Sequence, residues 1–337
     1  MEFFGFEFFG DLPQGWLMAV AAVFFAVGLA LIIKGGDWFV DSASWFAEAT
    51  GIPKFVVGAT VVSFATTLPE LLVSLRAAMN GSAQLAIGNA VGSVTANTTL
   101  IMGVSLVAMA GVVSRKSFSL KGGLLLGAML GLTLLSLGGN LPTWSAFVLW
   151  AIFLVFMISN LIEGKKAAAS EEIDTYEKKE IPKRLLFFVI GTASIVFGAE
   201  FLVASGKTLA AGIGISETII GFTVIALGTS LPELVTTLTA IRKKESSLSV
   251  GNIIGANIID ATLILPLCAV FNGKPLPVER ANLILDFPVC IAACAVAIIP
   301  TVIQGRFKKW QGFTLLAIYV LYMLVLILKE VGVGLPL

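Results

Sequence analysis

Two acidic motifs inside apolar sequence carry the residue types best suited to chemistry. The first reads TTLPE and ends at Glu70, and the second reads TSLPE and ends at Glu233. Because proline cannot donate a backbone hydrogen bond, Pro69 and Pro232 should each free the carbonyl four residues earlier and break a helix. A carboxylate in the middle of a bilayer costs at least about 2.5–3.5 kcal/mol, so each glutamate indicates a functional site.

Further oxygen atoms stand close to both glutamates in the sequence. Small hydroxyl side chains precede them: Thr66, Thr67, Thr229 and Ser230. In the next apolar segment of each half, Ser93 and Asn97 are four residues apart and would share one helical face, and Ala256 and Asp260 have the same spacing. We therefore expect a cluster built from carboxylates, an amide, hydroxyls and backbone carbonyls.

An all-oxygen cluster of this kind is a hard-ligand cation site. It suits Ca²⁺, which takes about 6–8 oxygen ligands, or Na⁺, rather than soft transition metals. The chain has no histidine, which removes the commonest transition-metal ligand. Three carboxylates could balance several monovalent ions, or one divalent ion with a remaining carboxylate protonated. Competition between ions for one charge-limited site couples opposing fluxes, which is what an antiporter needs.

The elements that must position these residues are membrane helices. Of the 337 residues, 57% are hydrophobic and 13% are charged, and the mean hydropathy is +0.97. A soluble domain is about a quarter charged. Apolar runs of membrane-spanning length predict ten helices, near residues 16–46, 53–79, 84–111, 120–138, 142–162, 185–210, 216–241, 247–271, 281–303 and 308–329. The predicted fold class is an all-α polytopic membrane protein.

One polar stretch, residues 163–184, divides these helices into two sets of five. We expect it to be a charged linker between a first repeat, residues 1–162, and a second repeat, residues 185–337. Lysine and arginine gather at the linker end of the helices. The positive-inside rule then places the linker in the cytoplasm and both termini outside the plasma membrane, the inner membrane of the cell. Five is an odd number, so the second half enters the membrane in the opposite sense.

The two halves are also related in sequence. Residues 58–104 align without a gap to residues 221–267, at an offset of 163, and 17 of these 47 positions are identical. Upstream, GGDWFVDSAS from Gly35 pairs with GAEFLVASGK from Gly198. Many matched positions are polar ones inside apolar helices, which a purely architectural repeat would not need. We therefore predict two inverted repeats with one ion site built from both copies of the acidic motif.

The motifs resemble those of the cation/calcium exchanger superfamily. The paired LPE motifs, followed by GN-x-x-G-x-x-x-x-N in the first half and GN-x-x-G-x-x-x-x-D in the second, are similar to its sodium/calcium exchanger branch. Proton/calcium exchangers of the superfamily typically carry a GNATE-like element where this chain has TTLPE and TSLPE. The resemblance covers essentially all ten helices. It implies antiport of Ca²⁺ against Na⁺ by alternating access, in which helices 1 and 6 slide across the other eight.

The resemblance also implies ligands for the transported ions. The calcium site would use two central carboxylates, two backbone carbonyls and two flanking side chains: Glu70 and Glu233, Thr66 and Thr229, and Asn97 and Asp260. The inner sodium site would use one backbone carbonyl and two side chains: Ser63, Thr67 and Ser93. The outer sodium site would use the equivalent group in the second half: the Ala226 carbonyl, Thr229 and Ser230.

Two positions depart from the family pattern. Ala256 stands where the family usually has serine, so the outer sodium site loses a hydroxyl ligand. Val94 stands where the family usually has asparagine, a change that affects packing more than ligation. The missing hydroxyl leaves open a proton- or potassium-coupled calcium or divalent-cation exchanger of the same superfamily.

Functions of other classes fit the residues less well. A cation channel is disfavoured by the two-fold repeat and by the absence of a filter-like loop in the sequence. An enzyme is disfavoured because the chain lacks histidine and any recognisable nucleophile–base pair. We expect no cofactor and, at a net charge of +1, no nucleic-acid partner. The expected partners are Ca²⁺ and Na⁺ as substrates and membrane lipid, with the protein acting as a monomer.

Overall fold

Helices make up almost all of this structure, a computed structural model that describes residues 13–111, 114–170, 178–213 and 228–330. The α-helices before the linker are α1 (Gln14–Thr50), α2 (Lys54–Val57), α3 (Ser63–Thr66), α4 (Leu68–Met79), α5 (Ala83–Ala96), α6 (Met102–Ala108), α7 (Arg115–Ser136) and α8 (Ser145–Ser170). Those after it are α9 (Ile181–Gly212), α12 (Leu231–Arg242), α13 (Ser246–Ile259), α14 (Leu265–Phe271), α15 (Phe287–Gln304) and α16 (Lys309–Glu330).

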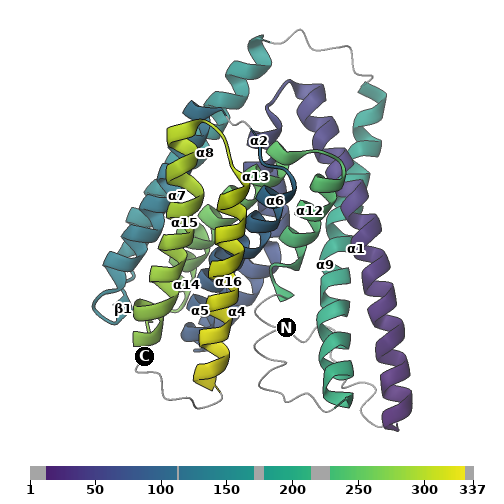
Figure 1. The fold of residues 1–337 in the computed structure, drawn as a ribbon, viewed down its shortest axis with the longest axis vertical. Helices are drawn as coiled ribbons and strands as arrows, with labels where there is room; N and C mark the ends of the chain where they lie inside the picture. Colours follow the sequence, from purple (N-terminus) through teal and green to yellow (C-terminus); the bar gives the residue numbers. More distant parts are fainter. Residues whose placement is uncertain (1–12, 112–113, 171–177, 214–227, 331–337) are drawn as a thin grey trace.

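Shorter elements join or flank these helices. Single π-helical turns are η2 (Gly58–Val62), η3 (Asn97–Ile101), η6 (Asp260–Ile264) and η7 (Asn282–Asp286), and η4 (Lys178–Glu180) is a 3₁₀ turn. Strands β1 (Asn140–Leu141) and β2 (Leu276–Pro277) pair antiparallel. The larger apolar core fills the space among α5, α7, α13, α14 and α15, where helices from both halves meet (Figure 1).

The chain is a multi-pass membrane protein by the length and composition of its helices. Within the described ranges, eight helical segments are long and apolar enough to cross a membrane. A ninth is counted if the bent pair Lys54–Thr66 and Leu68–Met79 is one span. The helix predicted at 216–241 is described from residue 228 onward, and its first part lies outside the described residues.

Two helix ends differ from the prediction at the linker end of the molecule. Helix α7 begins at Arg115 instead of near residue 120, and α8 continues to Ser170, into the predicted linker. Lys121, the second residue of the helix predicted at 120–138, is fully buried inside α7, and its Nζ atom lies 2.9 Å from Glu163 Oε2 of α8. This ion pair neutralises both charges, so the helices extend across positions that look like polar helix ends in the sequence.

Helices α1 and α9 form a long pair beside the remaining helices (Figure 1). Glycines allow their backbones to approach closely. A methyl group at Gly198 would lie 2.8 Å from the Gly28 carbonyl oxygen, and one at Gly35 would lie 2.9 Å from the Gly191 carbonyl oxygen. The repeat offset relates Gly28 to Gly191 and Gly35 to Gly198, so the two contacts are reciprocal.

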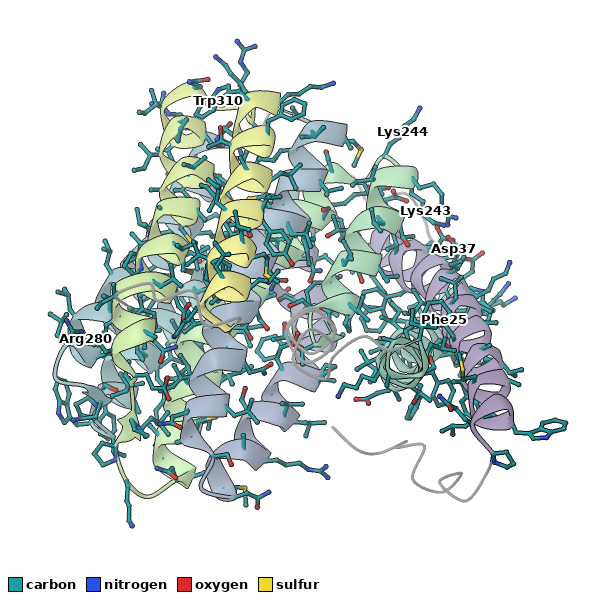
Figure 2. The ribbon with its side chains drawn as sticks, turned by 60° about the horizontal axis from the view of Figure 1, so that its bottom comes forward. Phe25, Asp37, Lys243, Lys244, Arg280 and Trp310 are labelled. Carbon is teal, nitrogen blue, oxygen red and sulfur yellow. The ribbon has the colours of Figure 1, made fainter. Side chains whose placement is uncertain are left out.

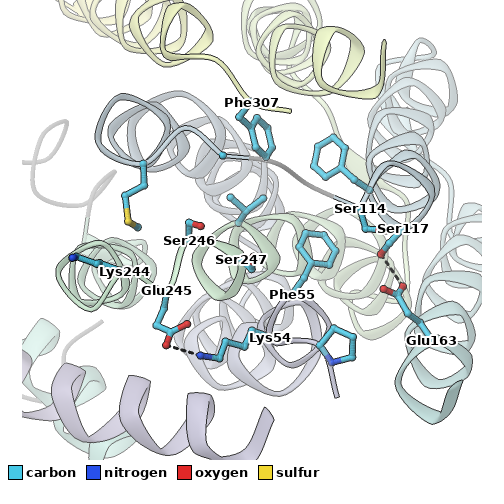
Figure 3. Close-up of a pocket in the computed structure, with 15 residues that line it drawn as sticks. Lys54, Phe55, Ser114, Ser117, Glu163, Lys244, Glu245, Ser246, Ser247 and Phe307 are labelled. Carbon is cyan, nitrogen blue, oxygen red and sulfur yellow. Dashed lines mark hydrogen bonds and ion pairs between the residues drawn. The ribbon is translucent and has the colours of Figure 1, made fainter. Parts of the chain in front are cut away.

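Charged side chains form ion pairs between helices at the linker end of the molecule. Lys54 Nζ lies 2.8 Å from Glu48 Oε1 of α1 and 2.7 Å from Glu245 Oε1 before α13. Glu163 also accepts a hydrogen bond of 2.7 Å from Ser117 Oγ. Four of these residues border a cavity of about 480 Å³: Lys54, Ser117, Glu163 and Glu245. Figure 3 shows the cavity with its lining side chains.

Candidate functional site

Each LPE motif begins a helix immediately after a break. The span that contains Glu70 bends by 47° between α3 and α4. Thr67, at the bend, has φ −87° and ψ 3°, and Ser230 before α12 has nearly the same values, φ −85° and ψ 6°. Proline fits the first turn of a helix because its missing N–H would have no partner there. The predicted breaks are therefore present, at the residue before each Leu-Pro-Glu.

The helix that begins after each break determines the position of one central glutamate. Glu70 and Glu233 occupy the first turns of α4 and α12, where the positive end of the helix dipole favours a carboxylate. Both side chains are buried, with 1% and 0% of their surfaces exposed. A buried carboxylate needs further compensation, because burial removes the water that would otherwise solvate its charge.

Two π-helical turns place the flanking side chains. Turn η3 begins at Asn97, and turn η6 begins at Asp260, the equivalent position in the second half. Such turns insert one extra residue into a helix and are frequent at functional sites. The spans that contain these turns, Ala83–Ala108 and Ser246–Phe271, are the most buried of the described membrane-length helices. Asn97 and Asp260 therefore lie in the centre of the molecule.

A group of buried oxygen atoms at this centre has no hydrogen-bond partner among the described residues. They belong to six of the side chains predicted from the sequence: Glu70 Oε1 and Oε2, Ser93 Oγ, Asn97 Oδ1, Ser230 Oγ, Glu233 Oε2, and Asp260 Oδ1 and Oδ2. Leaving one buried polar atom unpaired costs about 1–3 kcal/mol, and more for a charged group. A bound cation would satisfy several of these atoms at once.

The charges of the three carboxylates lead to the same conclusion. Glu70 lies close enough to Glu233 and Asp260 for their charges to interact when ionised, as does Asp260 to Glu233. Thr67 Oγ1 lies 3.3 Å from Glu233 Oε1, but it lies closer to the Ser63 carbonyl oxygen, at 2.7 Å, and has one proton to donate. In the described part of the chain, no three acidic, histidine or cysteine side chains are close enough to hold a single metal ion. Hydroxyls, amides and carbonyls would therefore have to supplement the carboxylates around any one ion.

Hydrogen bonds between the two halves of the chain position the threonines before the LPE motifs. Thr66 Oγ1 donates to Asn252 Oδ1 at 3.2 Å, and Thr229 Oγ1 donates to Asn89 Oδ1 at 3.2 Å. The same offset of 163 relates the two threonines and the two asparagines. Neither asparagine is among the site residues predicted from the sequence, although the repeated Gly-Asn dipeptide at residues 88–89 and 251–252 indicates them.

Other predicted site residues have local partners. The Ser63 carbonyl accepts from Thr67 N–H at 2.9 Å and from Thr67 Oγ1 at 2.7 Å. Thr66 Oγ1 also lies 3.3 Å from this carbonyl. Ala256 is fully buried on α13, one turn before Asp260. Ala226 lies outside the described residues.

Similar proteins are known in sequence and in structure. The sodium/calcium exchanger MaX1 of Methanosarcina acetivorans is 31% identical, over 92% of this chain and 99% of that protein. The inner membrane protein YrbG of Escherichia coli is 34% identical, over 76% of this chain and 81% of that protein. A solved structure of the sodium-calcium exchanger NCX_Mj, soaked with Na⁺ and Sr²⁺, matches with a TM-score of 0.79 and 28% identity, over 90% of this chain and 97% of the other.

The family described as sodium/calcium exchanger protein matches residues 20–162 and 183–328. The match includes both LPE motifs and both π-helical turns at the site. The sequence motifs, the helical fold and the buried oxygen cluster agree with this assignment, and the chain belongs to the sodium/calcium exchanger protein family.

Proposed function

We propose that this chain is a secondary antiporter that exchanges Ca²⁺ for Na⁺ across a membrane by alternating access. The buried, partnerless oxygens around Glu70, Glu233 and Asp260 carry this proposal. Their number and type suit a hard cation, whose charge would offset that of the carboxylates. Family membership and the exchanger names of similar proteins support the choice of ions.

The ligands of the proposed calcium site come from both halves. Glu70 and Glu233 would coordinate Ca²⁺ with their carboxylates, and Thr66 and Thr229 with their carbonyls. Asn97 and Asp260 would flank the ion. The threonine–asparagine bonds support this arrangement because they hold each threonine beside a glutamate while leaving the backbone carbonyl unused by the side-chain bond.

The proposed sodium sites lie on either side of the calcium site. The inner site would use the Ser63 carbonyl, Thr67 and Ser93. Sodium binding there requires the Thr67 hydroxyl to turn away from that carbonyl, because two hydrogen bonds from Thr67 now occupy it. The outer site would use the Ala226 carbonyl, Thr229 and Ser230.

Ten membrane helices in two inverted repeats would provide the alternating access. Reciprocal contacts between equivalent residues of the two halves support an inverted repeat: Gly28 with Gly198 and Gly35 with Gly191, and Thr66 with Asn252 and Thr229 with Asn89. In this proposal the protein acts as a monomer in the plasma membrane. The linker faces the cytoplasm and both termini lie outside.

The exchange function can be tested in proteoliposomes that contain the purified protein. We expect uptake of radiolabelled calcium into sodium-loaded vesicles and little uptake into vesicles without a sodium gradient. Glu70→Gln and Glu233→Gln should abolish exchange while leaving the protein inserted, because each removes a central charge at nearly constant shape. Full activity of either variant would overturn the site, and calcium movement indifferent to sodium would overturn the coupling.

A proton- or potassium-coupled exchanger is the second candidate, and one observation favours it. Ala256, fully buried one turn before Asp260, provides no hydroxyl at the equivalent of Ser93. Replacing the sodium gradient by a pH gradient or a potassium gradient separates the candidates. Calcium uptake driven equally well by either replacement would favour this second function.

A further inference from the structure

Two carboxylates occupy equivalent positions on the paired helices α1 and α9 but have different surroundings. The offset of 163 that relates the LPE motifs also relates Asp37 to Glu200. Asp37 forms an ion pair with Arg242 and lies 3.5 Å from Lys243 Nζ, at the end of α12. Figure 2 shows Asp37 close to Lys243. Among the described residues, no hydrogen bond or ion pair compensates the Glu200 carboxylate in this way, and Lys207 interacts with it electrostatically.

Glu200 borders a small cavity beside the two LPE motifs. The cavity has a volume of about 10 Å³, close to the size that one water molecule needs. Pro69 and Pro232 line it, and each directly precedes a central glutamate. Gly228 also lines it, four residues before Pro232, so its carbonyl lacks the usual helical donor. A carboxylate and a carbonyl without its usual helical donor therefore border one cavity beside the residues that precede the central glutamates.

The course of α9 indicates which membrane face this cavity serves. The helix begins beside the linker at Ile181 and continues past Glu200 to Gly212. Lys207, about two turns beyond Glu200, is close enough to interact electrostatically with it. Glu200 thus lies beyond the midpoint of α9, toward the face opposite the linker.

We propose that Glu200 is an ion-passage carboxylate, which attracts cations from the face opposite the linker into the central site. The inference rests on the proposed exchange function. Electrostatic attraction is proportional to the charge of the ion, so Glu200 favours Ca²⁺ over Na⁺. Asp37, its counterpart, is neutralised by Arg242 and Lys243, so the attraction acts from one face in this arrangement of the helices.

The test is calcium uptake by sodium-loaded proteoliposomes at a series of calcium concentrations. Glu200→Gln should raise KM for calcium about three- to tenfold at low ionic strength and change the maximal rate less than about twofold. At ~1 M salt the increase should shrink to less than about twofold, because the Debye length falls to about 3 Å. KM for sodium should change less than KM for calcium.

Three further variants distinguish attraction from a structural role. Glu200→Asp keeps the charge and should retain a KM near that of the wild type. Lys207→Gln removes a nearby positive charge and should lower KM about twofold. Glu180→Gln is the matched control, because Glu180 directly precedes the same helix on the linker side and is exposed and paired with Arg184 at 3.2 Å. This variant should leave KM unchanged.

An unchanged KM in Glu200→Gln would overturn the inference, as would a loss of maximal rate that is independent of salt. If Glu200→Gln fails to insert into the membrane, Lys207→Gln decides the test. A KM for calcium that is not lowered in Lys207→Gln would then overturn the inference. Absence of sodium-driven uptake in the wild type would contradict the proposed function. Normal wild-type uptake with an unchanged KM in Glu200→Gln would contradict this inference alone.

Discussion

The Thr66 hydroxyl donates a 3.2 Å hydrogen bond to the side-chain oxygen of Asn252, a residue in the other half of the chain. Both side chains are buried, at 2% and 0% exposure. The bond joins the break before α4 to the middle of α13, beside the buried glutamates. It therefore links the position of a proposed calcium ligand in one half to a helix of the other half.

This bond should make Thr66 and Asn252 act as one unit in calcium binding. Thr66→Val and Asn252→Ala should each weaken calcium binding about fivefold, since a buried hydrogen bond contributes about 1 kcal/mol. The double variant should bind no more weakly than the single ones, which titration calorimetry can measure. Thr133→Val is the control, because its hydroxyl bonds locally to the Met129 carbonyl at 2.8 Å. Additive losses would show that the two residues act independently.

Restoring a hydroxyl at residue 256 should strengthen sodium binding. Ala256→Ser adds an oxygen ligand beside the proposed outer sodium site. Ser93→Ala removes the equivalent hydroxyl, which is buried and unpaired among the described residues. We expect the sodium concentration for half-maximal exchange to fall about threefold in the first variant and to rise about threefold in the second. Unchanged sodium dependence in both variants would exclude these positions as ligands.

The close approach of α1 and α9 predicts a strong dependence on glycine. Gly198→Ala places a methyl group 2.8 Å from both the Gly28 carbonyl oxygen and Ile32 Cγ1. Such overpacking costs about 1–3 kcal/mol, and we expect a lower melting temperature in detergent together with slower exchange. Gly206→Ala, on the same helix, has no atom within 4 Å of the added methyl group. It should leave both properties unchanged, and equal effects of the two variants would contradict the packing argument.

The buried Lys121–Glu163 ion pair should stabilise the contact between α7 and α8. Glu163→Gln leaves the fully buried Lys121 ammonium without its carboxylate. It should lower the free energy of unfolding by about 3 kcal/mol, the low end for a broken buried pair, because Glu163 is 30% exposed. Thermal unfolding in detergent measures this change. Combining it with Lys121→Met should recover much of the loss. A double variant less stable than Glu163→Gln alone would contradict the explanation.

The residues of the candidate site stand out in the sequence because their chemistry conflicts with their surroundings. A glutamate after a proline inside an apolar helix has few structural explanations. The same motif occurs twice, at Glu70 and at Glu233, which argues against a chance occurrence. The helix breaks at Thr67 and Ser230 follow from the same prolines. The π-helical turns at Asn97 and Asp260 could not be predicted, because one extra residue in a turn leaves no signature in an apolar pattern.

Contacts between distant residues account for the rest of what the sequence did not reveal. Asn89 and Asn252 act through threonines more than a hundred residues away, and their partners depend on how the two halves meet. Lys121 and Glu163 look like helix-flanking charges until their helices are placed side by side. Local patterns predict elements and chemical types, whereas such pairings depend on the tertiary structure.

Coupled exchange is the central claim, and transport against a gradient tests it most directly. Proteoliposomes would be prepared with equal calcium on both sides and a sodium gradient, and the direction of net calcium movement would be recorded with a calcium-sensitive dye. We predict calcium accumulation on the side of higher sodium, reversal of this movement when the sodium gradient is reversed, and no movement with Glu70→Gln or Glu233→Gln. Calcium that stays at equilibrium in both sodium gradients would contradict the account.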